Sequence, residues 1–407
     1  MSGNISLLLA ASVTSLIWGD APPPPKFQPH KVTEVMAAVR DLQRAADAVV
    51  DGVAGSYEHR LELSERIAER LRAASSDVWR GPSDVHALLS YVLVGGDPGV
   101  LRDILRRGAI AEAQRGIALG VLAFAEQRLE QAKVHLLKAS LDTLPTDVAN
   151  AVALAQAAII AEERPAEAIE KLEVLRLNSR STQIEASALR QIALAAIRSG
   201  QLAEGLATIQ RYLRRFPRSL FNEQYITQFA TEIASAPGDA AAKLIQRAGL
   251  DIAAQNPEAG AKLLLEIARE AVFRGQLDLA VAAASAVAAV PGGDADAKRR
   301  ATLYKLAAEA ATGAGAKARE ELLSLPSDGL SAAEIELLDA SIAISSQVKS
   351  RRLPAAAVAP GQAESKPKAD KGSTPSERTS PLNAELVNRA KGVLKAADDA
   401  IVQRRTN

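Results

Sequence analysis

A small or apolar residue returns about every 37 positions along the second third of this chain and beyond, each time in the same helix–turn–helix context. The recurring positions are Ala132, Ala168, Gly205, a degenerate copy near 243, Ala280 and Ala318. A period of this length is typical of stacked helical hairpins, in which one hairpin cannot bury its apolar face alone and its neighbours complete a shared core. The repeat therefore predicts an all-α fold, a right-handed α-solenoid of antiparallel helical hairpins.

Prolines mark where the units end, because proline cannot continue the hydrogen-bond ladder of a helix. The closing prolines are Pro145, Pro217, Pro257, Pro291 and Pro326. Small residues at fixed places let the two helices of a unit approach closely. The units resemble tetratricopeptide repeats, although they are slightly longer and carry Ala or Leu where that family uses aromatics.

Composition agrees with this class, since 48% of the residues are hydrophobic but only 3% are aromatic. We expect residues 31–350 to form one array, because a solenoid grows by adding units and needs no second core. Before the repeats, helices are predicted over Val32–Val50 and Leu61–Leu71 as an antiparallel pair. Ser83 and Asp84 then cap a predicted helix over Val85–Val94, and Pro98 opens another over Gly99–Arg107.

The N-terminus carries an apolar run from Ile5 to Trp18, which is too short to cross a bilayer. Its length and the small residues after it predict a signal peptide over residues 1–21, followed by a Pro-rich linker over 22–30. No Lys or Arg precedes the run, and Pro22 is a poor residue just after a cleavage site. An uncleaved anchor and a buried N-terminal segment therefore remain as alternatives.

The C-terminal part changes character after residue 350. Residues 351–381 are rich in Pro, Ala, Ser and Lys and are predicted to be a disordered linker, and 382–404 to be an amphipathic helix. That helix either docks on the solenoid as a cap, binds a partner or lies at a membrane surface. Residues 349–407 carry 12 Lys or Arg against 6 Asp or Glu. The tail is therefore either simply solvated or attracted to an acidic surface such as lipid head groups or cell-wall polymer.

Catalytic and metal-binding patterns are missing from the sequence. The chain has no cysteine, and its four histidines are not spaced as metal ligands. The paired carboxylates are typical of solvated helix faces rather than of an apolar cleft. No cofactor is expected, and no nucleic acid either, because no basic stripe alternates with aromatics.

Three stretches carry a more specific resemblance: Leu88–Pro98, Gly120–Glu126 and Tyr212–Ser219. Together with the apolar N-terminus they resemble the alphaproteobacterial flagellar motility protein family MotC. The resemblance implies a periplasmic protein that associates with the periplasmic part of the MotB stator subunit and is needed for flagellar rotation. Because the apolar run is too short to cross a bilayer, we also expect no integral membrane span after signal cleavage.

Two groups of residues are candidates for partner binding. If the tetratricopeptide geometry holds, first-helix residues face the concave groove, namely Gln114, Asn150, Ser187 and Arg190. A second surface is predicted from Tyr212, Arg214, Arg215, Asn222 and Tyr225. The alternative for the second group is a structural role, because cations stabilise the negative end of a helix and an aromatic side chain can pack against the next hairpin.

The sequence thus predicts a non-catalytic protein-binding scaffold of the flagellar motor. A helical-repeat adaptor for envelope assembly or polysaccharide export shares every feature except the motility motifs. A non-catalytic remnant of a cell-wall lytic enzyme solenoid is the second alternative.

Overall fold

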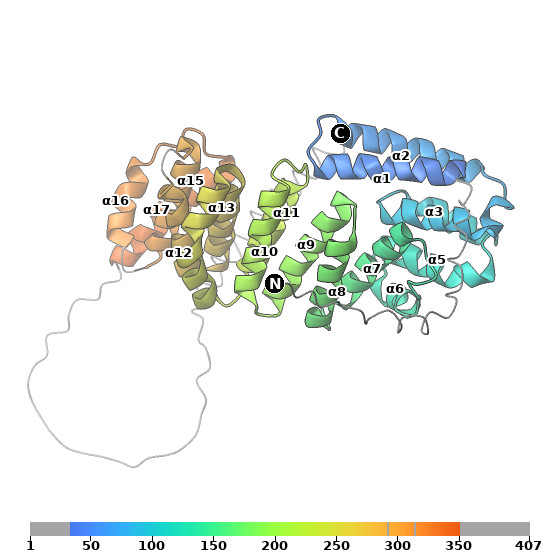
Figure 1. Ribbon diagram of the computed structural model, residues 1–407. Coiled ribbons are helices and arrows are strands. Elements are labelled where there is room, and N and C mark those ends of the chain that lie inside the picture. The colour runs from blue at the N-terminus through green and yellow to red at the C-terminus, as the bar shows by residue number, and fades with distance from the viewer. Residues whose placement is uncertain (1–32, 291–292, 313–314, 351–407) are drawn as a thin grey trace, which may run out of the picture.

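The computed structural model describes residues 33–290, 293–312 and 315–350, and every regular element in these ranges is a helix (Figure 1). The all-α prediction is confirmed for this part of the chain. Four predicted segments lie outside the described residues: the signal peptide (1–21), the Pro-rich linker (22–30), the C-terminal linker (351–381) and the last helix (382–404).

The N-terminal helices are α1 (Glu34–Val50), α2 (Ser56–Ala73), the 3₁₀ helix η1 (Val78–Arg80), α3 (Pro82–Leu93) and α4 (Pro98–Arg106). Side chains cap two of them: Thr33 Oγ1 accepts a hydrogen bond from Met36 N at 3.1 Å, and Asp97 Oδ1 accepts one from Gly99 N at 2.7 Å.

The predicted cap at Ser83 and Asp84 is wrong. Helix α3 already begins at Pro82, and the residue before it, Gly81, makes no side-chain capping bond. Proline suits the first helical turn because its φ is preset and no partner is needed there for an N–H. The helix therefore starts at the proline rather than after it.

The remaining helices follow with short connections. They are α5 (Glu112–Ala125), α6 (Leu129–Leu136), α7 (Thr146–Ile160), α8 (Pro165–Asn178), α9 (Thr182–Arg198), α10 (Leu202–Arg215), α11 (Asn222–Ile233), α12 (Gly238–Gln255), α13 (Pro257–Arg274), α14 (Leu277–Ala288), α15 (Ala295–Ala310), α16 (Gly315–Ser324) and α17 (Ala332–Ser350). Most helices in this series pack against the next one along the chain.

The recurring small residues are buried, and each is the fourth residue of an even-numbered helix. They are Ala132 in α6, Ala168 in α8, Gly205 in α10, Ala280 in α14 and Ala318 in α16. In α12 the equivalent residue is Ala241, which is fully buried, whereas Lys243 at the predicted position is exposed. The degenerate copy was therefore placed two residues too late, because its helix begins directly after Pro237.

Gly205 explains why these positions must be small. A Cβ atom built there would lie 2.6 Å from Ile197 Cγ1 and 3.1 Å from the carbonyl oxygen of Ala193, both on α9. Larger side chains would push α10 away from α9. The close approach buries the apolar face that the pair shares.

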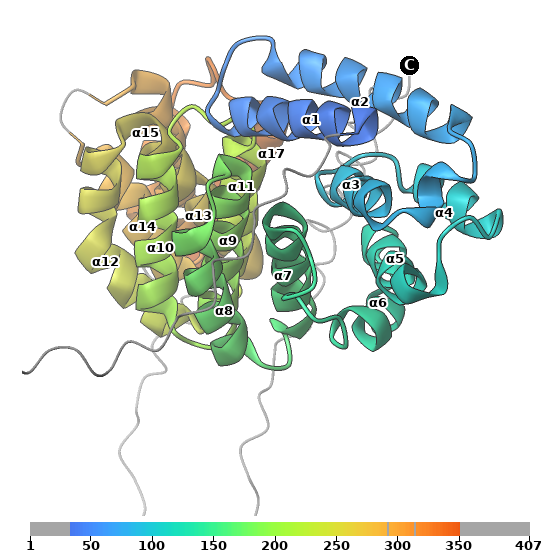
Figure 2. The ribbon, with the colours of Figure 1, turned by 45° about the vertical axis from the view of Figure 1, so that its right-hand side comes forward.

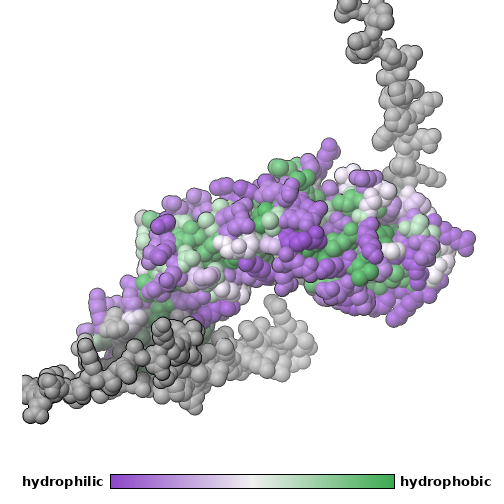
Figure 3. All heavy atoms as spheres, turned by 90° about the horizontal axis from the view of Figure 1, so that it is seen from below, coloured by the Kyte–Doolittle hydropathy of each residue, from purple (hydrophilic) through white to green (hydrophobic). Residues whose placement is uncertain are grey.

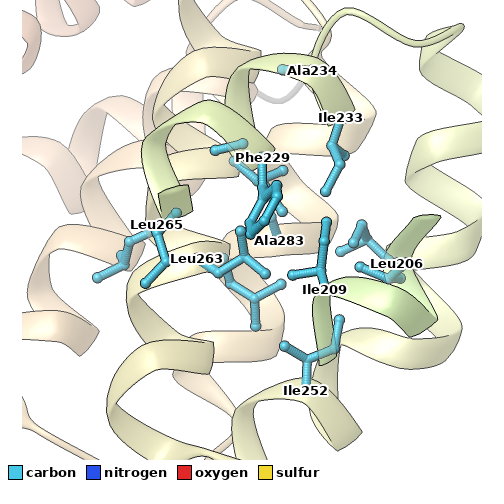
Figure 4. Close-up of a cluster of buried hydrophobic side chains, with 14 of the residues drawn as sticks. Leu206, Ile209, Phe229, Ile233, Ala234, Ile252, Leu263, Leu265 and Ala283 are labelled. Atoms are coloured by element: carbon cyan, nitrogen blue, oxygen red, sulfur yellow. The ribbon is translucent and has the colours of Figure 1, made fainter. Parts of the chain in front are cut away.

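The hydrophobic core runs along the molecule rather than forming one central mass. One large cluster joins helices α1–α8, and another joins α9–α15 together with Val50 at the end of α1. Smaller clusters lie between and beyond them. Figure 4 shows part of the second, where Ile209, Phe229, Ile252 and Leu263 converge from four successive helices.

Helix α1 departs from a simple stack of neighbours. It packs on α2 and α3, as sequence order suggests, but also on α9 (Figure 2). The backbone N–H of Leu220, in the α10–α11 connection, donates to the carbonyl oxygen of Val49 in the last turn of α1 at 3.4 Å. The first helix thus lies across the region from α3 to α9 and closes one side of it.

Candidate functional site

A groove of about 600 Å³ lies between α1, α7 and α9. We call it the α1–α9 groove. Its lining includes Arg40, Gln43, Arg44 and Asp47 from α1, Asn150 from α7, Arg180 from the α8–α9 connection, and Ser187, Arg190 and Gln191 from α9. Three predicted partner-binding residues, Asn150, Ser187 and Arg190, are therefore brought together on its wall.

Asp47 joins the two sides of the groove by hydrogen bonds. Its Oδ1 accepts hydrogen bonds from Ser181 Oγ at 2.7 Å and from the backbone N–H of Gln183 at 2.9 Å. The hydroxyl of Thr182 donates to the carbonyl oxygen of Asp47 at 3.4 Å. A carboxylate at the N-terminus of α9 is also favoured by the helix dipole, so this seam fixes the end of α1 on the start of α9.

The groove carries a surplus of positive charge. Its ionisable residues are Arg40, Arg44, Arg180, Arg190, Asp47 and Asp147. Arg44 is largely neutralised by Asp41, which it contacts at 2.5 Å. Within the described part of the chain Arg40 and Arg180 form no ion pair, so their charges face the groove and the solvent around it.

Arg190 links the groove to an aromatic cluster. Its guanidinium lies 4.9 Å from the centre of the Tyr225 ring, and its Nη1 donates to Gln228 Oε1 at 3.4 Å. The Nε of Arg190 is buried and makes no hydrogen bond to the described residues, as is true of Gln191 Oε1. The cation–π contact orients the guanidinium while leaving donor capacity unused.

The second predicted surface does not form as one patch, because Tyr212 is fully buried. Its ring packs against those of Phe216, Tyr225 and Phe229 at centroid distances of 5.6, 5.5 and 5.9 Å. Burial raises the pKa of the Tyr212 hydroxyl above its ordinary value. Tyr212 is a core residue and offers no surface to a partner.

The other members of that group have separate surroundings. Asn222 Nδ2 donates to the carbonyl oxygens of Phe216 and Pro217, at 2.8 and 3.0 Å, and so closes the loop after α10. Arg215 forms an ion pair with Glu185 at 3.3 Å and lies over the ring of Phe216. Arg214 is exposed in the last turn of α10, where a cation also stabilises the helix end.

Gln114 lies apart from the α1–α9 groove, in a second hollow of about 630 Å³ beside His86 and His135. Burial lowers the pKa of His86 below its ordinary value. The four first-helix residues therefore do not line one continuous surface. Gln114 instead faces residues of α3, α6 and the loop after α6, such as His86, His135 and Ser140.

Sequence reasoning missed the groove residues contributed by α1 and by the α8–α9 connection. Arg40, Asp47 and Arg180 belong to segments that are far apart in the chain, and Asp47 and Ser181 are separated by 134 positions. No local period or motif signals such a contact. The amphipathic face of α1 predicts burial but not the helix that covers it.

The surface elsewhere is mixed. On the face seen in Figure 3, hydrophobic side chains are interspersed among hydrophilic ones rather than gathered into one continuous patch. In the described ranges no helix combines the length and apolar content that a membrane crossing requires. Nor do three His, Cys, Asp or Glu side chains converge there in a way that suits a metal ion.

Comparison with known proteins gives a consistent result. A family model described as "Chemotaxis protein MotC" matches residues 4–406. The chain is 26% identical over 311 residues to the chemotaxis protein MotC of Rhizobium meliloti (strain 1021), which covers 76% of this chain and 71% of that relative. No solved structure gives a significant match. The chain therefore belongs to the MotC family and is a chemotaxis- and motility-related protein.

Proposed function

We propose that this protein is a non-catalytic, periplasmic scaffold of the flagellar motor that binds the periplasmic part of the MotB stator subunit. Membership of the MotC family over nearly the whole chain is the observation that carries the proposal. The relative from Rhizobium meliloti is itself named a chemotaxis protein. The body of the protein acts as a right-handed α-solenoid of tetratricopeptide-like hairpins that presents a groove to its partner.

The described helices support a binding role. The α1–α9 groove is lined mainly by α1, α7 and α9, with single residues from α3, α5 and α8. The polar contacts at its edges are structural: Asp47 fixes the end of α1, and Tyr225 orients Arg190. Such a rigid frame lowers the entropic cost of binding a partner, because the binding side chains are already placed.

Export to the periplasm is supported by the apolar run from Ile5 to Trp18 and the small residues behind it. The expected result is an N-terminus shortened near Gly19–Ala21 when the protein is purified from the periplasmic fraction and sequenced. Recovery of the chain only from the cytoplasm would contradict this part of the proposal.

Motility is the direct test of the function. Deletion of the reading frame should leave flagella assembled, as seen by electron microscopy, but cells immotile or slow in soft agar, and expression of the intact chain should restore swimming. Crosslinked tagged protein from motile cells should copurify MotB. Normal swimming in the deletion, or recovery of envelope-assembly components without the stator, would favour the competing adaptor.

A further inference from the structure

We propose that the α1–α9 groove binds an extended, acidic segment of the partner protein, with Arg180 and Arg190 pairing with its carboxylates. The inference rests on the proposed function and extends it by naming the chemistry of the segment that is recognised. Three observations on the described residues carry it, namely size, charge and hydrogen-bonding atoms without partners, together with the amino-acid composition of the chain's own ends.

The size suits a peptide. A volume of about 600 Å³ lies within the range of roughly 300–1,000 Å³ that ligand sites occupy. The lining is mixed, with Leu154 and Ile184 among amides and hydroxyls from Asn150, Ser187 and Gln191. This combination suits an extended backbone, whose peptide groups need donors and acceptors along their length while side chains need apolar contact.

The charge selects an acidic segment. Arg40, Arg180 and Arg190 have no carboxylate partner within ion-pair distance in the described part of the chain. The lining has two acidic residues, and one of them, Asp47, already accepts a hydrogen bond from Ser181. Asp147 is then the remaining acidic residue of the lining. Arginine suits carboxylates because its planar guanidinium can donate two parallel hydrogen bonds.

Two polar side-chain atoms in the wall of the groove have no hydrogen-bond partner among the described residues. Arg190 Nε is a buried donor and Gln191 Oε1 a buried acceptor. Buried polar groups without partners are rare, since each costs free energy. Both atoms are shielded from solvent by their neighbours, so a segment in the groove would reach them after the Arg190 and Gln191 side chains rotate toward it; it would then supply an oxygen for Arg190 and a backbone N–H for Gln191.

The chain's own ends are poorly matched to this groove. Residues 349–407 carry 12 Lys or Arg against 6 Asp or Glu, and residues 1–32 carry Lys26 and Lys31 against Asp20. Both segments are net positive and would meet the arginines with the same sign of charge. The groove is therefore matched to another protein rather than to a terminal segment of this one.

The experiment measures binding to the full-length protein with two probes. The first probe is a pair of fluorescent peptides of equal length, one alternating Glu and Ala and the other alternating Lys and Ala, whose binding is measured by fluorescence anisotropy. The second probe is the purified periplasmic part of MotB, whose binding is measured by calorimetry. The variants are Arg180→Glu and Arg190→Glu. Arg247→Glu on α12 is the matched control, since Arg247 is exposed and forms no ion pair within the described residues.

The wild type should bind the Glu peptide and not the Lys peptide, and binding should weaken as salt is raised. Each groove variant should weaken binding about 10- to 100-fold, as expected when one partner of a charge pair is removed, whereas Arg247→Glu changes it less than about twofold. Arg180 is exposed in a connection, so Arg180→Glu keeps the test valid if Arg190→Glu fails to fold.

The two proposals fail in different ways. If MotB binds the wild type and both groove variants equally, the groove inference is wrong while the stator function stands. If MotB does not bind but the Glu peptide binds in an Arg190-dependent way, the partner is wrong and the groove chemistry stands. Equal binding of both peptides would overturn the inference, as would tighter binding of a third fluorescent peptide, spanning residues 351–407, in the same anisotropy assay.

Discussion

Glu334 is a buried carboxylate, 6% exposed, that is held by four donors. Its Oε1 accepts from Tyr304 Oη at 2.7 Å and from Arg300 Nε at 2.5 Å, and its Oε2 accepts from the backbone N–H and the hydroxyl of Ser331 at 2.9 and 2.8 Å. Ser331 and Glu334 thus form a capping box at the start of α17, and the same carboxylate ties that helix to α15.

Removing this carboxylate should destabilise the C-terminal helices. Glu334→Ala leaves Arg300 and Tyr304 without their acceptor, and we expect the free energy of unfolding to fall by about 2–4 kcal/mol. Urea unfolding followed by circular dichroism measures the change. Glu336→Ala on the exposed side of α17 is the control and should lie within about 0.5 kcal/mol of the wild type. Equal losses in both variants would contradict the role of the cluster.

The same group predicts a pH dependence. Burial alone would raise the pKa of Glu334, but hydrogen bonds from Ser331, Tyr304 and Arg300 lower it below its ordinary value of 4.5. A carboxyl whose pKa is lowered on folding adds stability above its unfolded pKa, and that stability is lost as the pH falls through the folded pKa. Unfolding free energies measured from pH 6 to pH 3 should therefore fall less steeply for Glu334→Gln than for the wild type.

In the even-numbered helices from α6 to α16, helix pairing depends on the small residue at the fourth position. Ala168 in α8 is fully buried, whereas Ala166 in the same turn is exposed. A larger residue at the buried position forces the two helices apart, while at the exposed one it meets solvent.

Ala168→Leu should therefore destabilise the protein by about 1–3 kcal/mol, as is usual for overpacking. Ala166→Leu, which makes the same chemical change two positions away, should cost less than about 0.5 kcal/mol. The comparison uses thermal and urea unfolding of the two variants side by side. Similar losses for the pair would show that close packing at the fourth position is not what the repeat preserves.

Across the whole molecule, α1 fastens regions that are distant in the sequence. The hydrogen bonds of Asp47 to Ser181 and Gln183 join the first helix to the ninth, and Gly52 approaches the backbone of Arg218 so closely that no Cβ atom fits. Gly52 also has φ of 74°, a conformation that favours glycine. Helix α1 is thereby held as one wall of the α1–α9 groove.

Breaking this seam should loosen one part of the molecule selectively. In Asp47→Ala we expect faster amide hydrogen exchange over Glu34–Ala73 and at the start of α9, with little change over α13–α15. Asp41→Ala, which removes an exposed carboxylate from the same helix, is the control. A uniform rise in exchange over all helices would show that α1 instead supports the global fold.

The helical class and the positions of most helices followed from the sequence, because the signals for both are local. The repeat of small residues is set by contacts between adjacent helices, and Pro98 lies in the first turn of α4 as predicted. Pro257, predicted to close a unit, instead opens α13. The motifs at Leu88–Pro98 and Tyr212–Ser219 indicated the family that the comparisons then showed. Where a pattern was degenerate, as near 243, the prediction slipped by two residues.

The candidate site could be predicted only in part. Asn150, Ser187 and Arg190 line the groove together because they lie on the first helices of two neighbouring units, a placement that the sequence period predicts. Tyr212 was misplaced because aromatic character marks a core residue and a binding residue alike. The third wall of the groove was decided by the tertiary structure, since α1 meets α9 through residues 134 positions apart. The amphipathic pattern of a helix shows that one of its faces must be buried, but which element buries that face depends on the packing of the whole chain.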